Sequence, residues 1–269
     1  MNDTNIATIY KKVIPIGYDI ALHDCSGGYP DKDDCTWYHG NWMLLRYLGV
    51  VSNPYWHESF YKNALQYVHA NTKKIFLVAG TADFSMPLLC SESGIDSIDI
   101  CDICGTPLRI CQIVSEFVDC KWMTFVQDIC TELPMKYDII INDAFLSRFI
   151  EKDKPLKGIV NGLKQGGYYI TTLKQGKQNR GGDISNSIRR SFMQKVRERY
   201  IMNKTSLPDV DIDNISALYA DKMSSYPVSN EGEVYNLFSS AGLTILSLER
   251  GHVEGEFESS DYFRIVSKK

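Results

Sequence analysis

The alternation of apolar and amphipathic segments along the chain predicts an α/β protein. Five short β-prone runs follow one another, at 75–79, 97–102, 122–127, 137–142 and 168–173. Segments with helical spacing of apolar residues lie between most of them, over 86–93, 107–118 and near 156–163. Repeated strand–helix alternation predicts a parallel sheet with helices on both faces. Two further runs, 243–249 and 262–267, are joined by a short loop that suits a hairpin.

The N-terminal part of the chain follows a different pattern. An amphipathic piece spans Ile6 to Ile16, and two segments after Gly40 carry apolar residues at helical spacing. Residues 18–40, between the first piece and these two segments, are rich in Gly, Asp, Cys and aromatic residues. This composition predicts an irregular segment with turns. We therefore expect residues 1–70 to form a mostly helical cap over the active site.

A second interruption follows the fifth predicted strand, over residues 174–228. It begins with the polar loop KQGKQNRGGDISN and continues into a helix whose apolar residues stand four apart from Ile188 to Tyr200. After this helix the chain is polar, and we expect an irregular path up to Pro227. Residues 71–269, with this insertion, would form the sheet domain.

Composition and charge narrow the class of protein. The 269 residues are 44% hydrophobic and 23% charged, which is ordinary for a globular protein. A net charge of −4 argues against nucleic-acid binding through the overall field of the protein. No apolar run approaches the roughly 20 residues of a membrane span, and the N-terminus lacks a signal-peptide pattern. We expect a cytoplasmic protein without nucleic-acid or membrane partners; a homodimer is compatible with the sequence.

The eight cysteines do not follow a metal-binding pattern. In a cytosolic protein we expect them to be reduced thiols. Cys101 and Cys104 form the only C-x-x-C, and Cys101 falls within a predicted strand. A structural zinc site usually draws its four ligands from two close pairs, whereas Cys111, Cys120 and Cys130 follow singly. The sequence therefore predicts no metal site.

The first predicted strand leads into a turn of small residues. In KIFLVAGTADFSM, residues 74–86, the apolar run breaks at AGTA before Asp83 and Ser85 precede another apolar run. Small residues let a ligand approach the backbone closely, and the following helix start offers unpaired N–H groups. The alternative is an ordinary strand–helix connection. A dinucleotide fingerprint needs G-x-G-x-x-G, but the second and third glycines of that motif are missing here. The negative charge of Asp83 would also repel a pyrophosphate. Asp83 suits a ligand with a positive amine or sulfonium, which favours S-adenosylmethionine over NAD.

Acids stand at the ends of the next three predicted strands. Asp102 lies about twenty residues beyond Gly80, where nucleoside-binding folds place a carboxylate for the ribose hydroxyls. Asp128 and Asp143 end the third and fourth strands. Each has a simpler explanation, because Asp is a common helix N-cap. Three such acids at consecutive strand ends favour an adenosine-type cofactor.

These motifs together resemble the class I S-adenosylmethionine-dependent methyltransferases. The matching segments, in order, are LVAGTADFS, ICDICGTPL, FVQDICTELP, DIIINDAFLSRF and LKQGGYYITT. The resemblance covers about residues 70–175 by motif and 229–269 by strand order. It implies a seven-stranded Rossmann-like sheet with helices on both faces, a helical N-terminal extension and a helical insertion after strand 5.

The resemblance also implies a role for each matched position. Asp102 would hold the ribose hydroxyls, Asp128 would accept from the adenine amine, and Ile129 would pack against the ring. The chain departs from the family at Val78, where an acid is frequent, and at Ala82, which replaces a glycine. The implied cofactor-binding residues are Ala79, Gly80, Thr81, Asp83, Asp102, Ile103, Asp128, Ile129 and Asn142.

Methyl transfer needs positioning and, for a hydroxyl nucleophile, a base. The candidate bases are Asp143, His39 and His57. The histidines lie on or beside predicted helices, where surface or packing roles are more common, and a helix cap is an equal alternative for Asp143. Trp37, Tyr38 and Trp42 would form an aromatic wall against the sulfonium. We take Asp143, His39 and Tyr38 as the candidate catalytic residues.

Three functions fit these residues. The first is methyl transfer to a small-molecule acceptor. In the second, the cofactor's own amine or carboxylate attacks, so a cyclase or lyase would release methylthioadenosine. The third is a binder of the cofactor without catalysis. The acceptor would be defined by residues 18–60 and 174–228, and Arg46, Arg148 or Arg180 would suit a carboxylate or phosphate on it.

Overall fold

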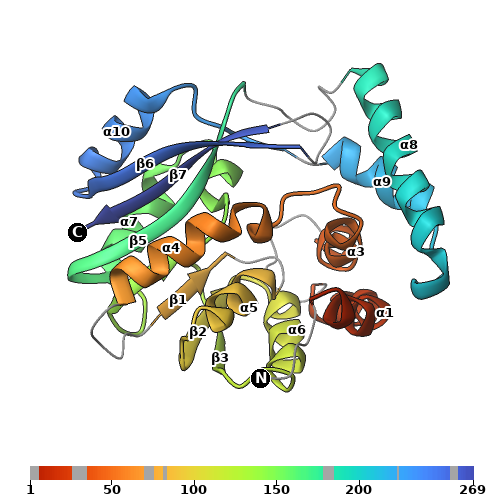
Figure 1. Ribbon diagram of the computed structural model, residues 1–269, viewed down its shortest axis with the longest axis horizontal. Helices are drawn as coiled ribbons and strands as arrows, with labels where there is room; N and C mark the ends of the chain where they lie inside the picture. The colour runs from red at the N-terminus through yellow and green to blue at the C-terminus, as the bar shows by residue number, and fades with distance from the viewer. Residues whose placement is uncertain are drawn as a thin grey trace.

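A computed structural model of the chain describes residues 6–25, 35–69, 76–80, 84–177, 185–222, 224–254 and 260–269. It contains one seven-stranded sheet in the order β3-β2-β1-β4-β5-β7-β6 (Figure 1). The first five strands pair in parallel, and β7 runs antiparallel between β5 and β6. The strands are β1 (Phe76–Ala79), β2 (Ser97–Asp102), β3 (Lys121–Val126), β4 (Tyr137–Ile141), β5 (Leu163–Gln175), β6 (Thr244–Val253) and β7 (Ser260–Lys268). The predicted fold class is confirmed.

Helices cover both faces of this sheet. The α-helices are α1 (Ile6–Asp24), α2 (Thr36–His39), α3 (Trp42–Tyr47), α4 (Glu58–His69), α5 (Ser85–Glu92), α6 (Gly105–Ser115), α7 (Asp153–Gly162), α8 (Asn186–Asn203), α9 (Ile212–Lys222) and α10 (Glu231–Ser240). Short 3-10 helices are η1 (Pro54–His57), η2 (Phe145–Arg148) and η3 (Lys204–Ser206). None of the described helices is both long and apolar enough to cross a membrane.

The parallel strands are buried on both sides, which explains their continuous apolar runs. In β1, Phe76 and Val78 belong to one hydrophobic core, and Leu77 and Ala79 belong to the other. The first core includes residues of α4, α5 and α6 and of the helices α1, α3, α8 and α9. The second core includes residues of α7 and α10. The sheet thus separates two layers of helices.

Two segments that the sequence predicts to be irregular are helical. Helix α1 continues to Asp24, and its residues Ile20 and Ala21 are buried. Helix α9 lies in the segment predicted to be irregular before Pro227, and it buries Tyr219 and Ala220. Both helices bury part of their surface against neighbouring helices, so packing contributes to their conformation.

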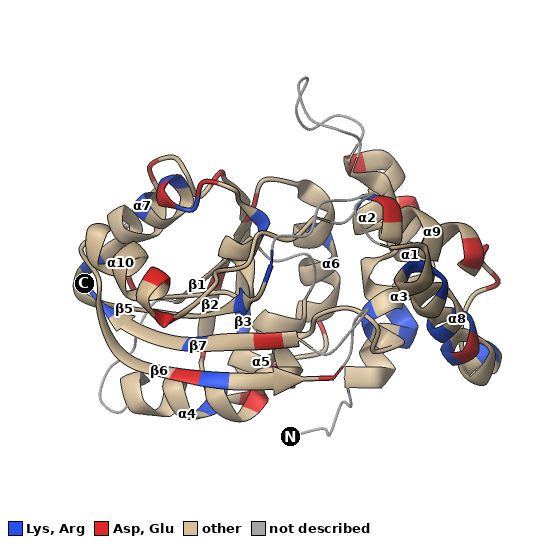
Figure 2. Cartoon of the chain, turned by 90° about the horizontal axis from the view of Figure 1, so that it is seen from above, with Lys and Arg blue, Asp and Glu red and all other residues tan. Residues whose placement is uncertain are grey.

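The helices of the insertion pack against the N-terminal helices at one end of the molecule (Figure 1). The rings of Phe192 and Tyr219 stack at 5.3 Å, and Tyr219 lies 5.8 Å from the ring of Trp42. Arg199 donates to the carbonyl of Leu48 at 2.7 Å. Lys and Arg residues of α8 lie beside acidic residues of α8 and α9 at this end (Figure 2).

Candidate cofactor and acceptor site

A cavity of about 790 Å³, the large cavity below, lies at the carboxyl ends of the parallel strands. Five of the predicted cofactor residues line it, namely Gly80, Asp102, Ile103, Asp128 and Ile129. Parallel strands bring their carboxyl ends to one edge of the sheet, so residues distant in sequence meet there. Of the other predicted cofactor residues, Ala79 and Asn142 line a neighbouring cavity, while Thr81 and Asp83 lie outside the described residues.

Gly80 immediately follows β1, in a conformation that favours glycine. Its φ is +65°, in the left-handed region that L side chains rarely adopt. A Cβ atom at this position would lie 2.1 Å from the ring of Phe145. The bare backbone of Gly80 therefore faces Phe145 where both cavities meet.

The two strand-end acids are fixed by the backbone that follows them. Asp102 Oδ1 accepts from the N–H of Cys104 at 2.9 Å, and Asp128 Oδ1 accepts from the N–H of Cys130 at 2.9 Å. Burial raises the pKa of Asp102 to about 7, against the opposing effect of the His39 charge. The acids thus form local turns and also line the large cavity.

A second cavity of about 100 Å³, the small cavity, adjoins the first. Tyr38, Gly80, Phe145 and Arg148 line both cavities. The floor of the small cavity includes Asn142 and Asp143 after β4, and its other walls include Trp42 and Arg46 of α3 and Tyr219 of α9. The cap and the insertion, which the sequence predicts to define the acceptor, therefore both contribute to this cavity.

Among the described residues, the carboxylate of Asp143 accepts hydrogen bonds through one of its two oxygens. Its Oδ1 accepts from the hydroxyl of Tyr61 at 2.8 Å and from that of Thr172 at 2.8 Å. Its Oδ2 is buried and has no hydrogen-bond partner among the described residues. The next residue, Ala144, is the one described non-glycine residue with a positive φ, at 49°. Backbone strain of this kind often marks a functional site.

Two donors that line the same cavity as Asp143 also lack a partner in the part of the chain that the structure describes. Asn142 Oδ1 accepts from the hydroxyls of Thr171 at 2.6 Å and Tyr169 at 3.1 Å, which fixes the orientation of the amide. Its Nδ2 and the Nε1 of Trp42 are buried without a hydrogen-bond partner in the described part of the chain. Buried polar groups are almost always paired, so these atoms indicate a place for a polar ligand or for water.

The other predicted catalytic residues occupy different environments. Tyr38 lies between the cavities, with its ring 4.5 Å from Trp42 and the Arg148 guanidinium 5.2 Å from its ring centre. His57 is buried, and its Nδ1 accepts from Arg264 Nε at 3.3 Å. Burial lowers the pKa of His57. The linings of the two cavities do not include His57.

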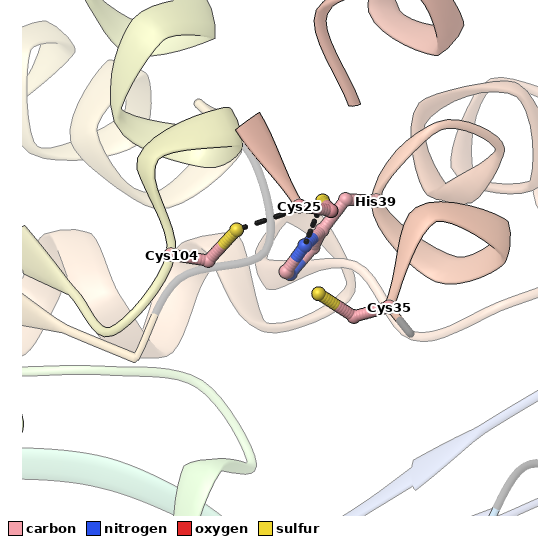
Figure 3. Close-up of side chains that lie close together, drawn as sticks. All are labelled: Cys25, Cys35, His39 and Cys104. Carbon is pink, nitrogen blue, oxygen red and sulfur yellow. Dashed lines mark hydrogen bonds between the residues drawn. The ribbon is translucent and has the colours of Figure 1, made fainter. Parts of the chain in front are cut away.

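His39 lies among cysteines and not beside Asp143. Its Nδ1 is 3.3 Å from the sulfur of Cys25, and Cys35 and Cys104 complete the group (Figure 3). Burial would lower the pKa of His39, but hydrogen bonds with Cys104 and Cys35 outweigh it and raise the pKa to about 10. Sequence reasoning missed this group because its members come from three separate segments.

The strand order and the position of the cavity define the class of the fold. An antiparallel β7 between β5 and β6, after five parallel strands with Gly80 and Asp102 at the ends of β1 and β2, is the arrangement of class I S-adenosylmethionine-dependent methyltransferases. The chain has this fold. Its sequence matches no family model and no curated protein.

Solved structures agree with this assignment of the fold. A methyltransferase from Methanosarcina mazei is 15% identical with a TM-score of 0.51, over 76% of this chain and 96% of its own. An S-adenosylmethionine-dependent methyltransferase from Clostridium acetobutylicum is 12% identical with a TM-score of 0.53, over 81% and 92%. The [4+2]-cyclase SpnF is 13% identical with a TM-score of 0.55, over 98% and 94%. At such low sequence identities, the similarity to these structures shows a shared fold only.

Proposed function

We propose that the protein is an S-adenosylmethionine-dependent methyltransferase acting on a small-molecule acceptor. The observation that carries this proposal is the pair of adjoining cavities. One is lined by the strand-end residues of the predicted nucleoside site. The other contains the buried Oδ2 of Asp143, which has no partner among the residues that the structure describes. They meet at Gly80 and Phe145.

The residues of the large cavity fit the cofactor. Asp102 presents a carboxylate for the ribose hydroxyls, and Asp128 presents one for the adenine amine. Ile103 and Ile129 supply apolar contacts for the adenine ring. The bare backbone at Gly80 leaves room for the methionine part, which Ala79, Thr81 and Asp83 would also hold. When bound, the cofactor supplies a methyl group activated by the sulfonium.

The residues of the small cavity fit an acceptor with a hydroxyl or amine. Asp143 Oδ2 would accept a proton from that group, while Tyr61 and Thr172 hold the carboxylate in place. Asn142 Nδ2 and Trp42 Nε1 would donate to acceptor oxygens. A cavity of about 100 Å³ admits the reacting part of a small molecule, and the arginines in its lining suit a carboxylate or phosphate.

The substitution Asp143→Asn tests the role of the base. The amide is similar in size but cannot take up a proton, so we expect turnover to fall about 10²- to 10⁴-fold with cofactor affinity unchanged. Turnover is measured as S-adenosylhomocysteine formed over a panel of small hydroxyl and amine acceptors, and affinity by calorimetry. Asp138→Asn is the control, because this half-buried carboxylate on β4 pairs with Lys164 away from both cavities. Equal turnover in the Asp143 variant and the wild type would remove Asp143 from the mechanism.

The substitution Asp102→Ala tests the cofactor assignment separately. We expect a loss of S-adenosylmethionine affinity, measured by the same calorimetry. Tight binding by this variant would show that the ribose lies elsewhere. Cofactor binding without turnover on any acceptor in the panel would instead favour a non-catalytic binder.

A second chemistry remains open on the same site. The volume of the small cavity, which Gly80 lines, also suits a reaction without a separate acceptor molecule. In such a reaction the cofactor's own amine or carboxylate attacks. Incubation with S-adenosylmethionine alone separates the two functions. A methyltransferase is inactive without acceptor and then forms S-adenosylhomocysteine once an acceptor is added. An intramolecular cyclase or lyase forms methylthioadenosine without one.

A further inference from the structure

Four potential metal ligands converge beside the large cavity. Cys25 follows the end of α1, Cys35 immediately precedes α2, His39 ends α2, and Cys104 immediately precedes α6 (Figure 3). Their ligand atoms all lie within 4.8 Å of one another. The side chains of His39 and Cys104 are buried, and those of Cys25 and Cys35 are half-buried.

The distances within the group match the edges of a tetrahedral zinc site. Two sulfurs bound to one zinc at about 2.3 Å lie about 3.8 Å apart, and a sulfur and an imidazole nitrogen lie about 3.5 Å apart. The sulfurs of Cys25 and Cys104 are 3.6 Å apart, and Cys25 Sγ is 3.3 Å from His39 Nδ1. Only the longer separations in the group need to shorten, by about an ångström, to complete the tetrahedron.

The surrounding backbone fixes the ligands in place. The carbonyl of Cys35 accepts from the N–H groups of Tyr38 and His39, each at 3.0 Å, so a single helical turn brings the two ligands to one side. The hydroxyl of Thr106 lies 3.0 Å from the sulfur of Cys25. The N–H of Cys104 donates to Asp102. Outer contacts of this kind orient the ligands of metal sites.

We propose that Cys25, Cys35, His39 and Cys104 bind one Zn²⁺ ion. Three thiolates and one imidazole are a ligand set that favours zinc among the common divalent metals. Because the protein fills all four positions, the ion has a structural role and leaves no position for a substrate. Each cysteine loses its thiol proton on binding.

The site joins the N-terminal cap to the sheet domain. Cys35 immediately precedes α2, His39 is its last residue, and Cys25 follows α1. Cys104 lies in the β2–α6 connection, two residues after Asp102 at the end of β2. All four ligands line the large cavity. The ion would therefore hold the cap beside the strand-end acids. This role is independent of the proposed methyl transfer, since it rests on the ligand geometry alone.

The full-length wild-type chain tests the proposal without any variant. We expect about one zinc ion per purified chain by mass spectrometry of the metal. After anaerobic removal and addition of Co²⁺, the visible d–d bands of a tetrahedral site and thiolate-to-cobalt charge transfer should appear and saturate at one equivalent. Absence of both zinc and the cobalt spectrum would overturn the proposal. So would an intact mass that shows a metal-free chain lacking two hydrogens, as a disulfide between Cys25 and Cys104 would give.

Variants locate the site. Cys104→Ser and Cys35→Ser should each lower metal affinity at least tenfold, whereas Cys120→Ser, a cysteine outside the group, should bind as the wild type does. His39→Cys keeps four ligands and should retain the metal with stronger charge transfer, because one more thiolate binds cobalt. Loss of metal from the Cys120 variant, or none from the Cys104 variant, would place the ion elsewhere.

Discussion

Gly80 has two independent reasons to be glycine, and they can be measured apart. Gly80→Ala places a Cβ in a left-handed conformation and against Phe145. Gly94→Ala is a matched control, because Gly94 also has a positive φ but no described atom lies within 4 Å of its Cβ position. We expect the strain alone to lower the free energy of unfolding by about 1–2 kcal/mol in the Gly94 variant, and the Gly80 variant to lose more.

Urea unfolding measures both variants, and cofactor binding distinguishes them. The Gly80 variant should bind S-adenosylmethionine weakly, while the Gly94 variant binds normally. If Phe145→Ala in the Gly80→Ala background does not recover part of the lost stability, contact with the ring is not the cause.

His57 makes stability depend on pH. Burial lowers its pKa below the ordinary 6.5, and its Nδ1 accepts from Arg264, which requires the neutral ring. As the pH falls below 6.5, the unfolded chain takes up a proton that the folded chain resists, so the free energy of unfolding falls. One proton contributes a slope of at most about 1.4 kcal/mol per pH unit.

The comparison variant is His57→Gln, which removes this titration. We expect urea unfolding between pH 7.5 and 5 to show a shallower pH slope in His57→Gln than in the wild type. His23→Gln, at an exposed position, serves as the control for removing a histidine. Identical slopes in the wild type and the His57 variant would mean that His57 titrates alike in both states.

At single positions, the sequence predicts the carboxylates better than the cysteines. Asp102 and Asp128 can be found because a parallel sheet fixes where strand ends lie. The pairing of Cys25 with Cys104 depends on how α1 packs against α6, and no local pattern encodes that contact. The surroundings of His39 also depend on this packing. The sequence therefore suggests a base at His39, whereas the structure places it among thiols.

Among the secondary-structure elements, the insertion shows which contacts hold a helix pair. Phe192 of α8 is buried and stacks on Tyr219 of α9. Arg197 and Asp213 form an exposed ion pair between the same helices. Phe192→Ala should lower the free energy of unfolding by about 3–5 kcal/mol, because it leaves a cavity in the core.

Arg197→Ala is the matched control on the same helix, and we expect it to change stability little, because exposed ion pairs contribute little. Urea unfolding and limited proteolysis of the α8–α9 segment give the readouts. Proteolysis that is faster in the Arg197 variant than in the Phe192 variant would show that charge, not packing, holds the insertion.

The predicted elements differ in how well local pattern determines them. The central strands are evident because burial on both faces demands uninterrupted apolar runs such as Ile139 to Ile141. Helix α9 escapes prediction because much of its surface is polar and its buried side depends on α3 and α8. Tertiary packing, rather than intrinsic propensity, determines such helices.

For the whole molecule, the sequence predicts the sheet but not the shape of the acceptor cavity. Strand order and the cofactor cavity belong to the fold, which many sequences share. The small cavity combines the end of β4 with α3 and α9, which come from opposite parts of the chain. Its shape therefore depends on how the cap and the insertion pack, and that arrangement had to be seen in three dimensions.

The Cys25, Cys35, His39 and Cys104 group also has a consequence for the order of folding. Three ligands precede β1 in the sequence and Cys104 follows it. The site is therefore complete only after a long loop has closed and α1 has docked. An ion captured that late stabilises the native state but not the transition state. Zinc should therefore slow unfolding and leave the refolding rate nearly unchanged in stopped-flow measurements. Faster refolding with zinc would mean that the metal assembles the cap early.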